Sequence, residues 1–274
     1  MIPTLENYLT KPAAPQRIEG GLRVQGVHPN NIQPFVSVIT VVRNGEKTLR
    51  QTIHSVLNQT YRPIEYIIVD GCSTDRTLDI IKSYEERIAY WISEPDQGIY
   101  DAMNKGIALA SGQWIHLLNA DDRYYDHSVL EQAVRTLDES KTNYFTLVRT
   151  LPNDRQKQQK FPYQGWQLYI LPRLPHPALV VAKQQYEQVG LYDTALKIAS
   201  DHDFTLRLLN KYPAKFTDTP FVVMSHEGFG SVNIELAFQE FRDVTIRYKF
   251  PLLLAWMVYY SKLVRWKLKQ KLDR

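Results

Sequence analysis

The sequence has 274 residues, of which 44% are apolar and 12% aromatic. This composition excludes a disordered chain, and the length allows one substantial hydrophobic core or one core with an appendage. A single cysteine, Cys72, excludes an internal disulfide, and no cysteine and histidine cluster has the spacing of a zinc site. The chain begins without a charged segment followed by an apolar stretch, so we expect no secretory signal and a reducing, cytoplasmic setting.

The net charge of +4 is unevenly distributed, because basic residues are concentrated at the C-terminal end. The stretch FPLLLAWMVYY at 250–260 precedes them and has about half of the ~20 apolar residues that a membrane-spanning helix needs. An apolar helix with a basic end predicts binding to an anionic membrane surface, and a helix packed on the protein's own core is the alternative. No nucleic-acid recognition module is visible, so no nucleic-acid partner is expected. The basic residues are Lys262, Arg265, Lys267, Lys269, Lys271 and Arg274.

Strand and helix patterns alternate along the first half of the chain. A leader at 1–34 is expected to be irregular, and VSVITVV at 36–42 is a β-branched run typical of a buried strand. After it, Leu49, Ile53 and Val56 share one helical face. The elements that follow are strands at 65–71, 89–93 and 114–118 and helices from about Arg76 and over 99–110. This alternation predicts an α/β fold with a mainly parallel sheet flanked by helices.

Polar side chains follow each of the four strands. They lie from Thr40 to Asn44, from Asp70 to Asp75, from Glu94 to Asp96 and from Asn119 to Asp122. The carboxyl ends of parallel strands meet at one edge of the sheet, where α/β proteins bind ligands. The coincidence of four polar strand ends therefore predicts a binding site at that edge.

Each strand end also has a purely structural explanation. Ser73, Thr74 and Asp75 suit the N-cap of the following helix, and Asn44 with Gly45 suits a turn. No GxGxxG follows the first strand and no GxxxxGK[ST] occurs, so a bound nucleotide needs another anchor. A divalent cation such as Mg²⁺ or Mn²⁺, held by carboxylates and shared with phosphates, meets that need.

Four motifs occur in order within residues 35–125: VSVITVVRNGEK, EYIIVDGCSTDRT, SEPDQGIYDAMNKG and HLLNADD. Together they resemble the nucleotide-binding half of the family 2 glycosyltransferases, which have the GT-A fold. Weaker similarity continues through 175–209 and 226–233. The resemblance implies a GT-A domain over 35–232 and a C-terminal helical, basic extension at 233–274. It also implies a nucleoside diphosphate sugar as the donor.

The resemblance assigns several residues to the donor site. The family's acidic residue that contacts the base and ribose corresponds to Asp70, although the second aspartate usual there is missing. Asp96 and Lys105 correspond to positions that line the donor site, and the ammonium of Lys105 suits a phosphate. Asn104 is expected to hold the loop. The other donor-binding candidates are Thr40, Asn44, Ser73 and Asn119.

The family's metal-binding DxD motif corresponds to Asn119, Ala120 and Asp121. Asn119 replaces the first carboxylate, and its amide can still hydrogen-bond the donor. Asp121 is therefore the expected principal ligand of Mg²⁺ or Mn²⁺, with Asp122 beside it as a helper. The alternative is that both aspartates only form a turn.

An inverting transfer also needs a carboxylate that takes the proton of the acceptor hydroxyl from the side opposite the nucleotide. KIASDHDFTLRLL places Asp201 and Asp203 at the head of an expected helix. The family's catalytic acid pair corresponds to Ser200 and Asp201, so Asp201 is the expected base. The alternative is that Asp201 only stabilises the helix N-terminus. Asp203 is expected on a different face and is the second choice.

Two histidines are further candidates. His176 corresponds to an acceptor-side polar position, and His226 precedes GFGS, which resembles a loop that closes over the donor. A structural role is the alternative for both. Trp166, with Tyr163 and Tyr169, suits stacking on a sugar, although core packing is the better expectation for these aromatic residues.

The sequence thus predicts an inverting glycosyltransferase that acts on a glycan or lipid-linked acceptor in cell-envelope polysaccharide synthesis. We expect it in the cytoplasm, peripheral at the inner face of the plasma membrane. A sugar nucleotidyltransferase is one alternative, although VVRNGEK is a poor match to the glycine-rich loop of such enzymes. A non-catalytic scaffold that binds nucleotide sugars is the other, and it would not need Asp201.

Overall fold

The computed structural model describes residues 2–27, 35–151, 153, 155–160, 176–225, 233–248 and 251–272. It confirms the expected alternation of strands and helices. The strands are β2 (Val36–Val42), β3 (Ile64–Asp70), β4 (Tyr90–Ser93) and β5 (Trp114–Leu117). The helices between them are α2 (Leu49–Leu57), α3 (Thr77–Lys82) and α4 (Ile99–Leu109).

These four strands lie parallel in the order β4-β3-β2-β5. The chain builds the sheet outward from β2 to β4 and then returns to place β5 on the other side of β2. In open α/β sheets, ligands bind at such a reversal, outside the carboxyl ends of the strands. The loops that follow β2 and β5 lie close together, since a Cβ atom added to Gly45 would be 3.8 Å from the Cβ of Ala120.

The second half of the chain extends the same sheet. Beyond β5 the order is β9 (Leu179–Ala182), β7 (Thr142–Thr150), β10 (Ala214–Met224) and β6 (Arg123–Tyr124), and β8 (Gln156–Gln159) pairs with β7. Here β9 runs antiparallel to both of its neighbours, whereas β7 and β10 are parallel. The helical elements are α5 (Val129–Val134), the 3-10 helix η1 (His176–Ala178), α7 (Lys183–Val189) and α8 (Ser200–Lys211).

The leader differs from the irregular segment that we expected. It forms helix α1 (Leu5–Leu9) and strand β1 (Ile18–Gly20), and β1 pairs antiparallel with β4 at one edge of the sheet. Arg17 Nε lies 2.6 Å from Glu94 Oε2, which ties the leader to the end of β4. The pairing covers the backbone groups that β4 would otherwise expose. A three-residue strand has too short a pattern to be recognised in the sequence.

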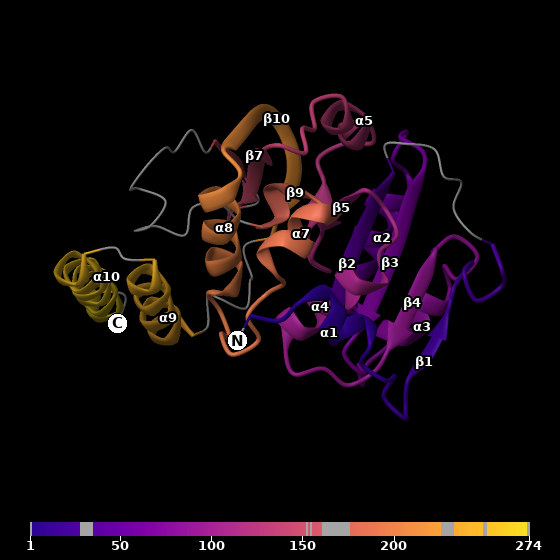
Figure 1. Cartoon of the computed structure of the whole chain (residues 1–274), viewed down its shortest axis with the longest axis horizontal. Helices are drawn as coiled ribbons and strands as arrows, with labels where there is room; N and C mark the ends of the chain where they lie inside the picture. The colour runs from indigo at the N-terminus through magenta and orange to yellow at the C-terminus, as the bar shows by residue number, and fades with distance from the viewer. Residues whose placement is uncertain are drawn as a thin grey trace.

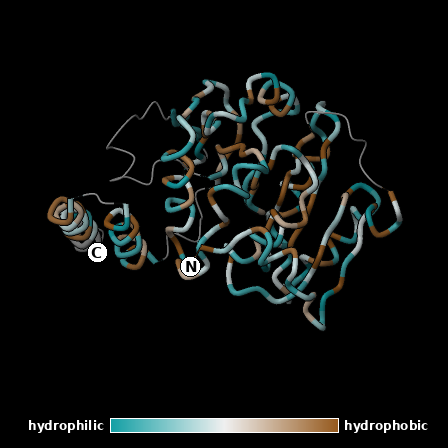
Figure 2. Tube along the Cα trace, in the orientation of Figure 1, coloured by the Kyte–Doolittle hydropathy of each residue, from teal (hydrophilic) through white to brown (hydrophobic). Residues whose placement is uncertain are grey.

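The hydrophobic core lies in and around the parallel strands. All seven residues of β2 are buried, and Figure 2 shows hydrophobic segments concentrated in the central strands. A parallel sheet with helices on both faces has no solvated face, so its strands are continuous apolar runs without alternation. This physical reason made β2 and β3 recognisable in the sequence.

Two C-terminal helices, α9 (Ile234–Arg247) and α10 (Leu252–Leu272), pack on each other at the end of the molecule opposite β1 (Figure 1). Ala255 and Tyr259 of α10 are buried, whereas Leu253 and Met257 are 73% and 59% exposed. One face of α10 is therefore docked, against α9, and binding of its exposed face to a membrane stays a prediction. Among the described residues, no helix has the length and apolarity to cross a bilayer.

Candidate active site

The loops after β2 and β3 are joined by their polar residues. The backbone N–H of Asn44 donates to Ser73 Oγ across 2.7 Å, and Asn44 Oδ1 accepts from the backbone N–H of Thr74 across 2.8 Å. Asn44 has φ +56°, a left-handed conformation that asparagine adopts more readily than most residues. The N-cap of the next helix is Arg76 rather than one of the three residues expected there, although Asp75 accepts the N–H of Thr77 across 3.0 Å.

Asp70, the expected contact for the donor base and ribose, is fully buried at the end of β3. Its Oδ2 accepts hydrogen bonds from Ser93 Oγ across 2.5 Å and from the backbone N–H of Ser73 across 3.1 Å. Thr40 is also fully buried and accepts a hydrogen bond from Tyr66 across 3.1 Å. In the structure these groups order the strand ends, and their direct contact with a donor stays a prediction.

Asp96, after β4, is half-buried, and burial raises the pKa of its carboxyl group. Its Oδ1 accepts the backbone N–H of Gly98 across 2.9 Å. A Cβ on Gly71 would collide with Asp96 Oδ2, so the loops after β3 and β4 are in direct contact. Asp96 therefore lies at the same edge of the sheet as Asp70.

Lys105 lies among acidic residues. Its Nζ is 2.9 Å from Glu94 Oε1 and 3.5 Å from Asp101 Oδ2, and it donates to the carbonyl of Pro95 across 2.7 Å. Burial opposes ionisation of Glu94, but the hydrogen bonds and charges of Arg17 and Lys105 lower its pKa to about 2. These contacts satisfy the ammonium group without a ligand, and the phosphate contact of Lys105 stays a prediction.

The segment that corresponds to DxD follows β5. Asp122 is buried, and its two oxygens accept hydrogen bonds from Asn119 Nδ2 and the backbone N–H of Ser225, each across 3.0 Å. Burial, together with the negative charge of Asp121, raises the pKa of Asp122 to about 8. Burial also raises the pKa of Asp121. The ionised forms of these two adjacent carboxyl groups are both disfavoured. A bound cation would stabilise the ionised forms, so the pair suits a cation site.

His176 of η1 lies between this segment and the expected base. Asn119 Nδ2 donates to Asp122, so Asn119 Oδ1 is free to accept a hydrogen bond from Nε2 of His176 across 3.0 Å. The other ring nitrogen, Nδ1, lies 3.9 Å from Asp201 Oδ2. The structure therefore brings together Asn119, Asp122, His176 and Asp201, which come from three separate segments of the chain.

Asp201 lies in the first turn of α8, as expected, and its side chain is 26% exposed. Its Oδ1 accepts the backbone N–H of His202 across 2.7 Å and lies 3.5 Å from the hydroxyl of Tyr100. The helix cap itself is Ala199, so Asp201 does not occupy the capping position. A carboxylate in the first turn of a helix also interacts favourably with the helix dipole, so the role of Asp201 as the base stays a prediction.

Asp203 has a structural role. It is fully buried, and its carboxylate lies 2.9 Å from both Arg207 and Arg247. Two positions after Asp201 on α8 it lies on a different helical face, as expected, and both of its oxygens are already paired. The expectation that Asp203 is a second candidate for the base is therefore wrong, because its carboxylate is buried and paired with two arginines.

Sequence reasoning missed two residues that support the site. His116 is buried on β5, and its Nε2 lies 3.0 Å from the carbonyl of Pro177, beside His176. Tyr100 of α4 lies beside Asp201. Both occur within the quoted motifs, but there they resemble ordinary core residues. Asn104 was expected to hold a loop and does so, because its amide pairs with both the N–H and the carbonyl of Tyr192 across 2.9 Å.

Among the described residues, no three histidine, cysteine or acidic side chains form a preformed cation site. Asp121 and Asp122 fit a different arrangement, in which Mg²⁺ takes one or two carboxylates and completes its shell with water and substrate phosphates. The remaining candidates lie outside the described residues. They are Tyr163, Trp166, Tyr169 and His226.

Sequence comparison identifies relatives over most of the chain. Residues 37–195 match the family model described as Glycosyl transferase family 2. A glycosyltransferase of Mycobacterium tuberculosis that is named as uncharacterized is 38% identical over 180 residues, which cover 64% of this chain and 68% of that protein. A PGL/p-HBAD biosynthesis glycosyltransferase of Mycobacterium bovis is 27% identical over 212 residues, which cover 76% of this chain and 82% of that protein.

Solved structures have the same fold. S. aureus TarS 1-349 in complex with UDP-GlcNAc superposes with a TM-score of 0.63 at 17% identity, over 83% of this chain and 71% of that one. The mannosyltransferase PcManGT from Pyrobaculum calidifontis, in complex with GDP-Man and Mn²⁺, gives 0.59 at 18% identity, over 89% and 70%. These likenesses confirm the expected GT-A-like α/β fold. The family match also decides against the sugar nucleotidyltransferase alternative, and the chain belongs to glycosyl transferase family 2.

Proposed function

We propose that this glycosyltransferase moves a sugar from a nucleoside diphosphate sugar to a glycan or lipid-linked acceptor of the cell envelope, with inversion at the anomeric carbon. One observation carries the proposal. His176 contacts Asn119 across 3.0 Å and lies 3.9 Å from Asp201, so the candidate metal side and the candidate base belong to one site. A donor held at the end of β5 would then present its sugar toward α8.

The donor class is supported by the bound molecules of similar structures. TarS was solved with UDP-GlcNAc, and PcManGT with GDP-Man and Mn²⁺. A relative named for PGL/p-HBAD biosynthesis supports a biosynthetic role. In this chain the exposed Asn44 and the half-buried Ser73 and Asp96 lie at the edge where a nucleotide would bind.

Asp121 is the residue that we propose to hold Mg²⁺ or Mn²⁺, with Asp122 behind it. Asp122 already uses both oxygens in hydrogen bonds to other residues, whereas the carboxylate of the half-buried Asp121 is hydrogen-bonded to its own backbone N–H. A bound divalent ion would neutralise charge on the departing diphosphate. One carboxylate of the chain is sufficient to bind the ion, because the diphosphate itself supplies further oxygen ligands.

Asp201 is the proposed base. Its carboxylate would take the proton of the acceptor hydroxyl while that oxygen attacks the anomeric carbon. The bond from the anomeric carbon to the diphosphate then breaks, and the diphosphate leaves with the electron pair. Attack from the side opposite the diphosphate inverts the configuration. The 26% exposure of Asp201 leaves its carboxylate open to an acceptor, with His176 beside it.

Helix α10 supports an acceptor at a membrane surface. Leu253, Met257, Tyr260 and Val264 are each more than half exposed and share one helical face. Basic residues follow them toward the C-terminus. A helix with this distribution lies on an anionic membrane with its apolar face in the interface. We therefore propose that α10 binds the inner face of the plasma membrane and brings the site to a lipid-linked acceptor.

A donor screen tests the proposal. The purified chain of 274 residues is heated with UDP-, GDP- and dTDP-sugars, with Mn²⁺ or with a chelator, and nucleotide release is measured in parallel. We expect one nucleotide class to raise Tm only when metal is present, because a ligand of the folded state stabilises it by mass action. The proposal is wrong if no sugar nucleotide is bound or cleaved under any metal condition. Binding without transfer to any envelope extract would support the scaffold alternative.

A further inference from the structure

Glu240 lies on α9, outside the part of the chain that resembles the family, and its carboxylate contacts the segment that leads into α8. Its Oε1 accepts the backbone N–H of Lys197 across 2.8 Å. Its Oε2 accepts those of Ile198 and Ala199 across 2.8 Å and 2.9 Å. These three N–H groups immediately precede the helix that carries Asp201.

The burial of Glu240 makes these contacts strong. The side chain is 8% exposed, and the salt bridges among the described residues give it no cationic partner. A buried carboxylate is costly unless hydrogen bonds replace its water. Three charge-assisted bonds from consecutive backbone N–H groups supply that replacement, and such bonds are about twice as strong as neutral ones. The carboxylate and the loop therefore hold each other in one arrangement.

The same loop is held from the opposite side by α4. The hydroxyl of Tyr100 donates to the carbonyl of Ile198 across 2.5 Å and lies 3.5 Å from Asp201 Oδ1. The peptide group that joins Ile198 to Ala199 is thus fixed at its N–H by Glu240 and at its carbonyl by Tyr100. Because Asp201 follows within one helical turn, a shift of this peptide group would move the carboxylate.

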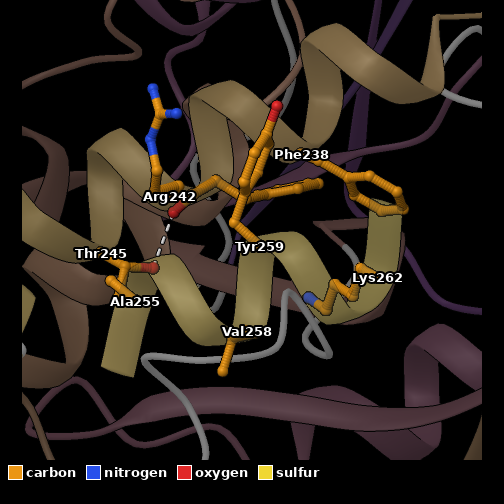
Figure 3. Close-up of a pocket in the computed structure, with 8 residues that line it drawn as sticks. Phe238, Arg242, Thr245, Ala255, Val258, Tyr259 and Lys262 are labelled. Atoms are coloured by element: carbon orange, nitrogen blue, oxygen red, sulfur yellow. Dashed lines mark hydrogen bonds between the residues drawn. The ribbon is translucent and has the colours of Figure 1, made fainter. Parts of the chain in front are cut away.

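Helix α9 also contacts α8 further along. Arg247 lies 2.9 Å from Asp203 and 3.1 Å from Asp193, and Val244 packs in a small hydrophobic cluster with Ala199 and Leu206. Helix α9 also packs against α10, and the two helices line a small pocket with residues that include Phe238 of α9 and Tyr259 of α10 (Figure 3). Helix α9 is therefore the connection between the base-carrying helix and α10.

We propose that Glu240 is a positioning residue for the transfer reaction, which places the Asp201 carboxylate by fixing the Lys197 to Ala199 backbone. The inference rests on the proposed function, in which Asp201 is the base. It gives the C-terminal extension a part in turnover in addition to membrane binding. A misplacement of about 1 Å in a reacting group can cost roughly 100-fold in rate.

The test compares Glu240→Gln with Glu235→Gln. Both substitutions remove one negative charge from α9, but Glu235 lies exposed in the first turn of that helix. The readouts are kcat and KM for hydrolysis of UDP-GlcNAc or GDP-Man with Mn²⁺, in which water takes the place of the acceptor. Calorimetric titration with the corresponding nucleoside diphosphate and Mn²⁺ counts intact donor sites. Amide hydrogen exchange reports on residues 197–203.

For Glu240→Gln we expect kcat to fall roughly 10- to 100-fold, with KM and the number of donor sites unchanged and faster exchange at 197–203. Glu235→Gln should behave as the unsubstituted chain. The inference is overturned if Glu240→Gln keeps full kcat, or if donor sites are lost in proportion to kcat, since the latter would mean a general role in folding.

If Glu240→Gln fails to fold, Glu240→Asp serves instead, because it keeps the charge but withdraws the carboxylate by one methylene. Reduced kcat with a full complement of donor sites supports the inference, and full kcat overturns it. Failure of the proposed function itself can be told apart from a reduced or an unchanged kcat of the variant. In that case the unsubstituted chain itself cleaves no donor.

Discussion

Nε2 of His176 donates a hydrogen bond to Oδ1 of Asn119 across 3.0 Å, between residues 57 positions apart in the sequence. This contact gives a role to the amide that stands where the family has a carboxylate. The amide donates to Asp122 through its nitrogen and accepts from His176 through its oxygen. An aspartate at position 119 would accept from His176 but would lose the N–H that Asn119 donates to Asp122.

His176 variants should separate its two contacts. His176→Gln can keep an N–H donor toward Asn119, whereas His176→Leu keeps none. We expect the leucine variant to lose roughly tenfold or more in kcat/KM for the donor, in part through a higher KM. The glutamine variant should have a KM close to that of the unsubstituted chain. Steady-state kinetics of donor hydrolysis measures both. A leucine variant with unchanged kcat and KM would show that the contact has no part in turnover.

Asp201→Asn should abolish turnover while leaving donor binding intact. The amide retains the shape of the side chain but cannot accept the acceptor's proton, and general-base contributions are roughly 100- to 10,000-fold. Nucleotide release gives the rate, and calorimetric titration gives the affinity for the nucleoside diphosphate. The matched control is Asp79→Asn, an exposed acid on α3. Transfer at the unsubstituted rate would refute Asp201 as the base.

Asp121→Ala should weaken metal-dependent binding of the donor. The variant loses the carboxylate that we propose as the principal ligand of the ion, so the rise in Tm produced by nucleoside diphosphate and Mn²⁺ should fall toward its value in a chelator. Thermal unfolding with and without Mn²⁺ measures the difference. Equal stabilisation of the variant and the unsubstituted chain would count against a metal at this position.

Glu94 predicts a specific pH dependence of stability. Its pKa is lowered from 4.5 to about 2 in the folded chain by Arg17 and Lys105, against the effect of burial. A lowered pKa contributes stability that is fully present above the unfolded value and is lost as pH falls through the folded value. Glu94→Gln should therefore cost roughly 3 kcal/mol of unfolding free energy at pH 6 and progressively less from pH 4.5 toward pH 2. Urea unfolding of both chains across this range checks the trend. A difference that stays constant with pH would contradict it.

The exposed face of α10 should govern membrane binding. Leu253→Ser with Met257→Ser removes two side chains that are 73% and 59% exposed, so the fold should be unaffected. Binding to vesicles that contain phosphatidylglycerol should weaken roughly tenfold or more, because each apolar side chain contributes about 1.5 kcal/mol or more when buried in the interface. Leu9→Ser on α1, 63% exposed, is the control. Co-sedimentation of the double variant equal to that of the control would reject the membrane contact.

Local patterns determined much of this protein. The β-branched run of β2, the turn at Asn44 and the position of Asp201 at the head of α8 follow from residue patterns and helix-end preferences, which act over a few residues. The order of motifs along the chain likewise predicted the family, and the polar strand ends predicted the edge of the sheet that carries the candidate site.

Only the tertiary structure decided which distant residues meet. The sequence does not indicate that His176 lies between Asn119 and Asp201, that Lys105 faces Glu94, or that Glu240 holds the backbone before α8. Such contacts depend on strand order and helix packing. Every residue except proline has a backbone N–H, so the sequence does not indicate which N–H groups will bind a distant carboxylate. The leader was missed for the same reason, since strand β1 is stabilised by the edge of β4 rather than by its own three residues.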